Sequence, residues 1–254
     1  MVTARVSSLY RYPIKGLSPE RLERVTLEKG EYFPGDRLYA VENGPAGFDP
    51  AAPEHQPKIK YLMLMRQERL ARLKTSYDDA SRVLTIRQGG AVAASGDLGT
   101  AEGRAAVESF LASFMGEELR GAPRFLTAPR GYRFTDSRSG FVSIINLASV
   151  REIARLAGRE AIDPLRFRGN IMIEGFDAWS ELNMAGRGIR IGGATLRGIK
   201  PIERCAATNV DPSAGLRDLR IPELLERHFG HNDCGLYCEV VEGGEVKEGD
   251  NVES

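Results

Sequence analysis

Short runs of alternating or β-branched residues, punctuated by glycine and proline, constrain the fold of this chain more than any other feature. Four such runs lie at residues 4–10, 22–27, 38–41 and 83–87. Each has the composition of a β-strand. Turn-forming residues separate them, as at Pro13, Gly16 and Pro34-Gly35. Many short strands joined by such turns indicate a small barrel or a sandwich.

Helical periodicity appears in three later segments, at residues 107–114, 147–157 and 222–229, and glycine marks the end of each. Further strands are expected at 171–173, 189–191, 194–199 and 236–241, with 236–241 and 245–247 forming a hairpin through Gly243-Gly244. The pattern breaks between Gly116 and Pro123, where we place a boundary between two parts of the chain.

Charge and cysteine content exclude several classes of protein. The chain has 35 basic and 35 acidic residues, so no global field draws it to nucleic acid or to anionic lipid. Its apolar runs are too short to cross a bilayer, and its first residues lack the apolar core of a secretory signal. Three cysteines, Cys205, Cys234 and Cys238, are too few and too sparse for a disulfide framework. We expect a soluble cytoplasmic protein with no nucleic-acid or membrane partner.

Cys205 is the strongest single candidate for chemistry. It follows Arg204 directly and precedes a turn at Asp211-Pro212 and Gly215. An adjacent guanidinium favours the thiolate, which is both a nucleophile and a soft metal ligand. The alternative is a small buried hydrophobic side chain, which is what most lone cysteines are.

Two short segments in the first part of the chain could bind an anion. Lys15-Gly16 follows the first strand, and it combines a point charge with a glycine that lets a ligand approach the backbone. Asp36-Arg37 follows Gly35 and offers an arginine fork for a phosphate. The alternatives are a solvated lysine in a turn and an exposed ion pair.

A third basic segment leads into the strand at 171–173. Alternation places Arg166, Arg168 and Asn170 on one side and Phe167 on the other. Arginines and an amide on one face can grip an anion and the edge of a heterocycle. An edge strand with a solvated basic face explains the spacing equally well.

A fourth cluster contains zinc-ligand residue types. His228, His231, Cys234 and Cys238 lie within eleven residues, but their spacing is irregular for a tetrahedral site. His228 also completes the apolar face of its helix. The sequence therefore favours buried cysteines and a surface turn over a metal site.

Taken in order, these segments resemble one family. The pieces are Lys15-Gly16, Gly35-Asp36-Arg37, Phe134-Thr135-Asp136-Ser137, Leu147-Ala148-Ser149, Arg166-Phe167-Arg168-Gly169-Asn170, Arg204-Cys205 with Val210-Asp211-Pro212, and the closing 245–250. This set looks like a MOSC protein, with the N-terminal β-barrel extension of the mitochondrial amidoxime-reducing component and its bacterial relatives. The resemblance covers nearly all 254 residues.

The resemblance implies a mixed α/β, β-rich fold. An N-terminal MOSC β-barrel domain would span residues 1–118, and a barrel-like MOSC domain with a few helices would span 119–254. It also implies a molybdenum–pterin cofactor held between them. The implied contacts are Lys15, Gly16, Arg37, Asp136, Asn146, Arg168, Asn170 and Cys205. Lys15 and Arg37 would hold the terminal phosphate, and Cys205 would be the catalytic thiolate on molybdenum. Asp136, Asn146, Arg168 and Asn170 would orient the pterin.

The implied activity is reduction of an N-hydroxylated small molecule by removal of its oxygen at molybdenum. The chain lacks a Cys-x4-Cys-x2-Cys run, so its electrons would come from a separate protein, either ferredoxin-like or a b-type cytochrome with its reductase. Pyridoxal phosphate binding is a term of the family as a whole, and we assign no residue to it.

Some positions depart from the family pattern. Gly16 stands where a serine is frequent, and Gly169 where a proline is frequent. Residues 47–57 lack the basic, Thr-rich segment that is common there, which bears on substrate scope. Two alternatives stay open: a sulfur carrier or cofactor-binding module with a persulfide on Cys205, and an interaction protein that has lost the activity.

Overall fold

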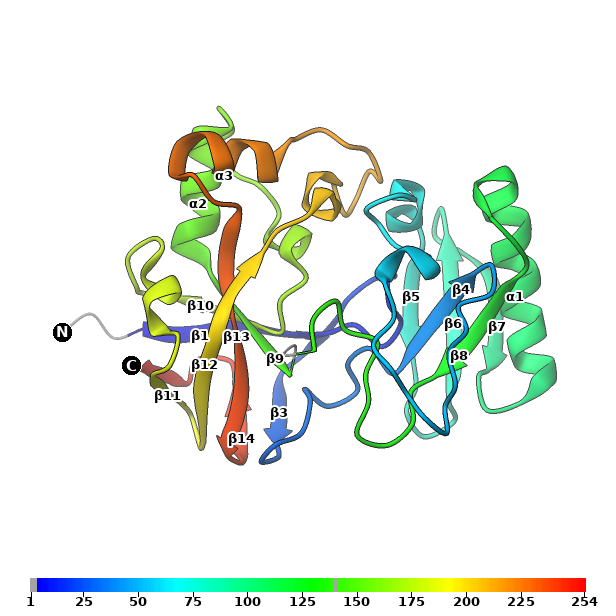
Figure 1. Ribbon diagram of the computed structural model, residues 1–254, viewed down its shortest axis with the longest axis horizontal. Coiled ribbons are helices and arrows are strands. Elements are labelled where there is room, and N and C mark those ends of the chain that lie inside the picture. The colour runs from blue at the N-terminus through cyan, green and yellow to red at the C-terminus, as the bar shows by residue number, and fades with distance from the viewer. Residues whose placement is uncertain (1–3, 139–140) are drawn as a thin grey trace.

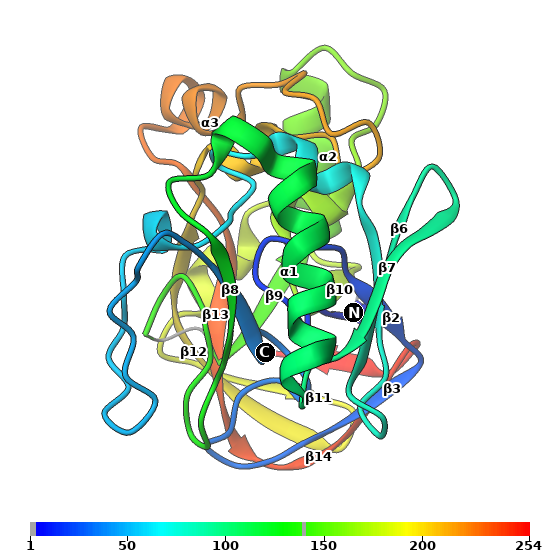
Figure 2. The ribbon, with the colours of Figure 1, turned by 90° about the vertical axis from the view of Figure 1, so that its right-hand side faces the viewer.

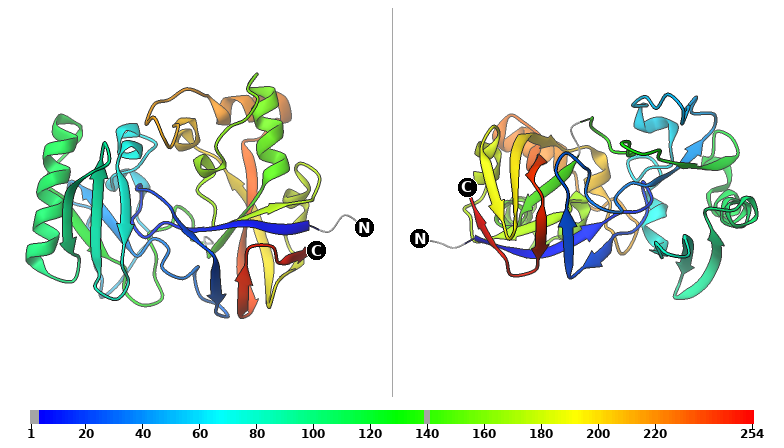
Figure 3. Two further views of the ribbon diagram at one scale, coloured as in Figure 1. Left: turned by 180° about the vertical axis from the view of Figure 1, so that it is seen from behind. Right: turned by 90° about the horizontal axis from the view of Figure 1, so that it is seen from below.

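The computed structural model describes residues 4–138 and 141–254, which form two lobes side by side (Figure 1). The larger lobe is built on a barrel and includes both ends of the described chain. The smaller lobe is built from residues of the first half of the chain. Figure 3 shows that the chain leaves the barrel at the end of β1 and crosses to the smaller lobe.

Seven strands of the larger lobe close into a barrel in the order β10, β9, β13, β12, β11, β15 and β1, and β1 pairs with β10 to complete the ring. Their bounds are β1 Ala4–Arg11, β9 Val142–Asn146, β10 Ile171–Glu174, β11 Gly188–Ile191, β12 Ala194–Glu203, β13 Asp233–Glu242 and β15 Asn251–Glu253. The β9–β10 pair is parallel, and the other pairs are antiparallel. Alternate side chains such as Leu9, Ile144 and Leu236 fill the interior.

The first strands of the chain belong to this barrel. Besides β1, β2 (Glu20–Leu22) extends the sheet, and β3 (Arg24–Leu27) pairs with β14 (Gly244–Lys247). The prediction that residues 236–241 and 245–247 form a hairpin is therefore wrong. Both edges of β13 are already paired, with β12 and β9, so β14 has to find another partner. The division after residue 118 stays a prediction.

The smaller lobe contains two small sheets and a helix. The first sheet pairs β4 (Tyr39–Asn43) with β8 (Pro123–Thr127), and the second contains β5 (Lys74–Tyr77), β6 (Val83–Gln88) and β7 (Ala91–Asp97). Figure 2 looks onto α1 (Ala101–Met115), with the strands behind it. Buried side chains such as Val41, Ile86 and Leu111 form the shared core. The side chain of Thr100 accepts a hydrogen bond from the Gly103 amide and so caps the helix.

Two helices cover one end of the barrel (Figure 1). They are α2 (Leu147–Leu156) and α3 (Ile221–Phe229), and they pack together over Ile145 and Met172. Short 3-10 helices complete the chain: η1 Lys58–Lys60, η2 Glu68–Arg72, η3 Gly116–Glu118, η4 Pro164–Phe167, η5 Ser180–Met184 and η6 Ala206–Asn209. All three predicted α-helices are confirmed, and so is the β-rich mixed α/β class. Within the described ranges, no helix is both long enough and apolar enough to span a membrane.

Candidate functional site

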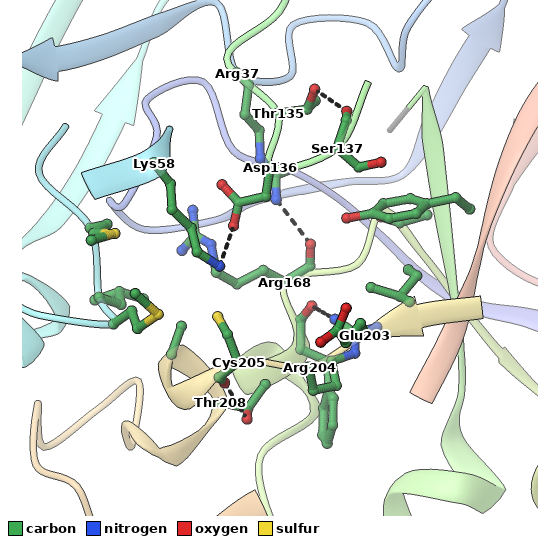
Figure 4. Close-up of a pocket in the computed structure, with 18 of the residues that line it drawn as sticks. Arg37, Lys58, Thr135, Asp136, Ser137, Arg168, Glu203, Arg204, Cys205 and Thr208 are labelled. Atoms are coloured by element: carbon green, nitrogen blue, oxygen red, sulfur yellow. Dashed lines mark hydrogen bonds and ion pairs between the residues drawn. The ribbon is translucent and has the colours of Figure 1, made fainter. Parts of the chain in front are cut away.

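A cavity of about 500 Å³ lies between the two lobes and receives side chains from both (Figure 4). Among the described residues that line it, the cationic ones are Lys15, Arg37, Lys58, Arg166, Arg168, Lys200 and Arg204, and the acidic ones are Asp36, Asp136, Glu203 and Asp233. Seven cations against four carboxylates leave a positive surplus. The cavity therefore suits an anionic ligand.

Lys15 lies on the cavity wall just beyond β1 and is almost completely buried. Its ammonium donates to the Phe134 carbonyl at 3.0 Å and pairs with Asp136. Burial lowers the pKa of Lys15, and the neighbouring arginines lower it further against the opposing effect of Asp136. Gly16 has φ 83°, and a Cβ there would lie 2.8 Å from the Leu62 carbonyl oxygen. A glycine is therefore needed to turn the chain at this point.

Arg37 and Arg168 both lie against the buried Tyr12 ring, with guanidinium carbons 4.4 and 4.3 Å from its centroid. Asp36 binds Arg37 through Nη1 at 2.5 Å, and Nη2 of Arg37 donates to the Arg168 carbonyl at 3.1 Å. Both arginines have left-handed backbone, with φ 47° and 52°. Two segments far apart in sequence are thus locked together at the cavity.

Arg168 retains an unused donor. Its Nη1 donates to the Leu17 carbonyl at 2.8 Å, but its buried Nη2 has no hydrogen-bond partner in the part of the chain that the structure describes. Burial, and then the charge of Arg37, lower the pKa of Arg168 to about 10. A bound anion would supply the missing acceptor and offset the repulsion.

Asp136 lies in the cavity, as the resemblance implied, and its side chain is 46% exposed. It binds Lys15 and lies 3.8 Å from the Lys58 ammonium. Desolvation opposes ionisation, but the charges of Lys15 and Lys58 outweigh it and hold the pKa of Asp136 below its usual range. Asp136 is therefore a carboxylate at neutral pH, available to accept hydrogen bonds.

The two asparagines have different positions. Asn170 lines the cavity, but its Oδ1 accepts from the Ser143 amide and hydroxyl, and its Nδ2 donates to the Tyr10 carbonyl. Asn146 is not among the described residues that line the cavity. Its side chain caps α2 and donates to Glu181 at 3.0 Å. The structure thus brings Asn170, but not Asn146, to the other predicted site residues.

The segment before β10 is not the strand that alternation suggested. Residues 164–167 form η4, and Arg168 follows in the left-handed region. Arg166 is therefore buried, and it bridges Asp211 at 2.9 Å and Asp218 at 2.8 Å. Two-residue alternation failed because the backbone here is helical and then reversed.

Cys205 is partly exposed and lines the cavity just before η6. Arg204, however, turns away from it. Its Nη1 donates to the Phe167 carbonyl at 2.8 Å and its Nε to the Cys234 carbonyl at 2.6 Å. The expected effect of Arg204 on the thiol is therefore not supported by its hydrogen bonds.

The cation beside Cys205 is Lys58, which sequence reasoning missed. Figure 4 shows its ammonium between Asp136 and Cys205. Burial lowers the pKa of Lys58, but its interactions with Asp136 and then Cys205 raise it by more, so the net shift is upward. Lys58 follows Gln56-Pro57 and is the first residue of the short 3-10 helix η1. A lysine there carries no periodic signal that could have marked it.

The zinc-ligand cluster does not converge. Cys234 and Cys238 are fully buried, and burial raises the pKa of both thiols, to about 12 for Cys234. His231 accepts a hydrogen bond from the Asp233 amide at 3.1 Å. Across residues 4–138 and 141–254, no group of three or more His, Cys, Asp or Glu side chains is arranged to hold a metal ion.

A barrel with a partly exposed thiol in a cationic cavity defines a class of protein suited to an anionic ligand beside sulfur. Two family models identify the class further: the MOSC N-terminal beta barrel domain matches residues 3–127, and the MOSC domain matches residues 131–253. The chain belongs to the MOSC family. Binding of the molybdenum cofactor is associated with this domain.

Three solved structures are similar to the chain. The YuaD protein from Bacillus subtilis is 15% identical, with TM-score 0.48, over 98% of this chain and 94% of that one. YiiM from Geobacillus stearothermophilus is 17% identical, with TM-score 0.37, over 51% and 65%. YiiM from Escherichia coli is 20% identical, with TM-score 0.34, over 44% and 53%. No curated protein matches the chain.

Proposed function

We propose that this protein is a cytoplasmic molybdenum-cofactor-binding oxidoreductase that reduces N-hydroxylated small molecules. One observation carries the proposal. A partly exposed thiol, Cys205, shares a cavity with a buried guanidinium nitrogen of Arg168 that has no partner among the described residues. The thiol suits a soft metal, and the unpaired donor suits an anion.

The residues present fit a molybdenum–pterin group. Lys15, Arg37 and Arg168 would hold its phosphate, because they gather cationic donors at one part of the cavity. Asp136 offers carboxylate oxygens to ring N–H donors. Cys205 would be the protein ligand to the metal. Asn170 would act indirectly, by fixing Ser143, which also lines the cavity.

When bound, the group would supply two-electron reduction with removal of the substrate oxygen. The chain would supply position and charge. The ammonium of Lys58 would place a hydrogen-bond donor beside Cys205, where the oxygen of the substrate would bind. Asp136 would keep the Lys58 side chain in place. A separate protein, ferredoxin-like or a b-type cytochrome with its reductase, would deliver the electrons.

Metal analysis and fluorescence of the oxidised pterin test this proposal, on protein from a host that makes the cofactor. We expect stoichiometric molybdenum and pterin in the wild type and loss of bound molybdenum in Cys205→Ser, whereas the cofactor-free forms of the two proteins should have the same melting temperature. Cys234→Ala serves as the control, since Cys234 is buried away from the cavity. Wild-type protein without molybdenum or pterin would contradict the proposal, and a persulfide on Cys205 in its mass spectrum would favour a sulfur carrier.

A further inference from the structure

The loop of residues 211–218, which we call the 211–218 loop, reaches from the barrel lobe to the smaller lobe beside the cavity (Figure 1). On the barrel side, Arg166 holds both of its ends through Asp211 and Asp218. On the other side the loop meets η2. A Cβ on Gly215 would lie 2.7 Å from Cγ of Arg72, so the two segments are in close contact.

One side chain of this loop joins both walls of the cavity. Nη1 of Arg217 donates to the Ala206 carbonyl at 3.1 Å, next to Cys205. Its Nη2 donates to the Met65 carbonyl at 2.8 Å and to Glu68 at 3.1 Å. Met65 and Cys205 line the same cavity from opposite lobes. Arg217 itself is not among the described lining residues, so it lies behind the walls that it connects.

The planar guanidinium suits this position. Its donors are fixed in a fork, so acceptors on two segments are held at a set separation, which a flexible lysine cannot reproduce. The Arg217 side chain is 31% exposed, and hydrogen bonds from a charged donor to carbonyls are stronger than neutral ones. Lys74 adds a hydrogen bond to the Pro212 carbonyl at 2.7 Å.

We propose that Arg217 is a positioning residue that sets the width of the cavity between Met65 and Cys205, and that it thereby selects by size the molecules that reach the Cys205 thiol. Narrow molecules pass between the two walls of the cavity, and bulky ones are excluded as long as the hydrogen bonds of Arg217 connect these walls. The inference goes beyond the proposed reduction, because it applies to any chemistry at Cys205.

Two maleimides of different bulk test this inference on the full-length chain without cofactor. N-methylmaleimide and N-(1-pyrenyl)maleimide carry the same electrophile, so the ratio of their rates cancels the intrinsic reactivity of the thiol. Cys205→Ser gives the background, since Cys234 and Cys238 are fully buried. The variants are Arg217→Gln and Arg217→Lys, the second of which keeps the charge.

We expect Arg217→Gln to raise the pyrenyl-to-methyl rate ratio about tenfold, which corresponds to about 1.4 kcal/mol. Arg217→Lys should raise it by a smaller factor. Arg69→Gln is the matched control. It removes an arginine of the same η2 that pairs with Glu118 instead of the loop, and its ratio should equal that of the wild type.

An unchanged ratio in both Arg217 variants would overturn the proposal, and so would a wild type whose pyrenyl-to-methyl rate ratio equals that of a small free thiol such as glutathione. If Arg217→Gln fails to fold, the rate ratio measured for Arg217→Lys tests the proposal by itself. In protein loaded with cofactor, the same variants should improve kcat/KM for bulky substrates relative to small ones. If the alkylation ratio shifts but no reductase activity is found, the size selection stands and the proposed function falls.

Discussion

Replacing Arg168 with methionine tests whether the buried charge of this residue, which suits the cavity for an anion, lowers the stability of the fold. Burial and the charge of Arg37 lower the pKa of Arg168 from 12.5 to about 10. Because one pKa unit corresponds to about 1.4 kcal/mol, keeping this charge costs the folded state on the order of 3 kcal/mol. The variant removes that cost and keeps much of the apolar volume.

Two favourable contacts are lost in the same variant. The hydrogen bond from Nη1 to the Leu17 carbonyl contributes about 1.5 kcal/mol for a charged donor, and the contact with the Tyr12 ring contributes about 1 kcal/mol. We therefore expect the free energy of unfolding to stay constant or to rise by about 1 kcal/mol, whereas most substitutions lower it by about 0.5–3 kcal/mol.

Urea unfolding, followed by the fluorescence of the single tryptophan, Trp179, measures this change. The experiment is repeated with inorganic pyrophosphate as an anion probe. At about 100 times its Kd, a ligand adds about 2.7 kcal/mol to the stability of the wild type. Arg168→Met should gain less, because it lacks the unpaired Nη2 donor. Arg5→Met removes an arginine from β1 that is 64% exposed and pairs with Glu174, so it should keep the full response.

Either of two results would refute this reasoning. A loss of about 2 kcal/mol or more in Arg168→Met without pyrophosphate would show that the guanidinium stabilises the empty fold. An equal response to pyrophosphate in the wild type and the variant would show that Arg168 is not an anion donor.

Three further predictions concern residues around the site and in the barrel. Gly16→Ser should lower the free energy of unfolding by about 1–2 kcal/mol instead of adding a useful phosphate donor, because φ is 83° and a Cβ would meet the Leu62 carbonyl; a urea midpoint equal to the wild type would contradict this. Tyr12→Phe should raise it by about 1 kcal/mol, since the buried hydroxyl has no partner among the described residues; a less stable variant would reveal a bonded hydroxyl. Burial raises the pKa of Glu181 despite its hydrogen bonds, so its contribution to stability is fully present below the unfolded pKa of about 4.3 and is lost as the pH rises through the folded pKa. The difference in unfolding free energy between the wild type and Glu181→Gln should thus fall from roughly pH 4 upward, and a difference independent of pH would argue against this assignment.

The sequence predicted local structure better than it predicted partners. Periodicity and terminal glycines located all three helices, because these signals lie within a few residues of one another. The pairing of β1 with β10, more than 150 residues away, and of β14 with β3 carries no such signal. The residue pattern of a strand shows that its edges can pair with other strands. Which strand it pairs with depends on which edges of the other strands are already paired.

The same limit applies to the site. The resemblance to the MOSC family implied that Lys15, Arg37, Arg168 and Cys205 belong to one site, and the structure places all four on one cavity. The sequence did not give side-chain direction. Arg204 is adjacent to Cys205 but donates to backbone carbonyls elsewhere. The cation beside the thiol, Lys58, comes instead from the other lobe, where it begins the short 3-10 helix η1, which no repeat pattern in the sequence predicts.

Arg37 and Arg168 combine backbone strain with like charge, and this combination argues for a bound ligand. Arg37 and Arg168 are two of the four non-glycine residues with positive φ in the described chain, and each such residue costs about 1–3 kcal/mol. Their like charges also lie against one buried ring, that of Tyr12, with both guanidinium carbons within 4.4 Å of its centroid. The contacts with the Tyr12 ring offset only part of this cost. It persists because surrounding contacts hold it, and a bound anion between the donors would return part of that energy. An anion that binds at Arg37 and Arg168 would therefore raise the stability of the fold, so unfolding measured with and without an anion reports on function before any substrate is known.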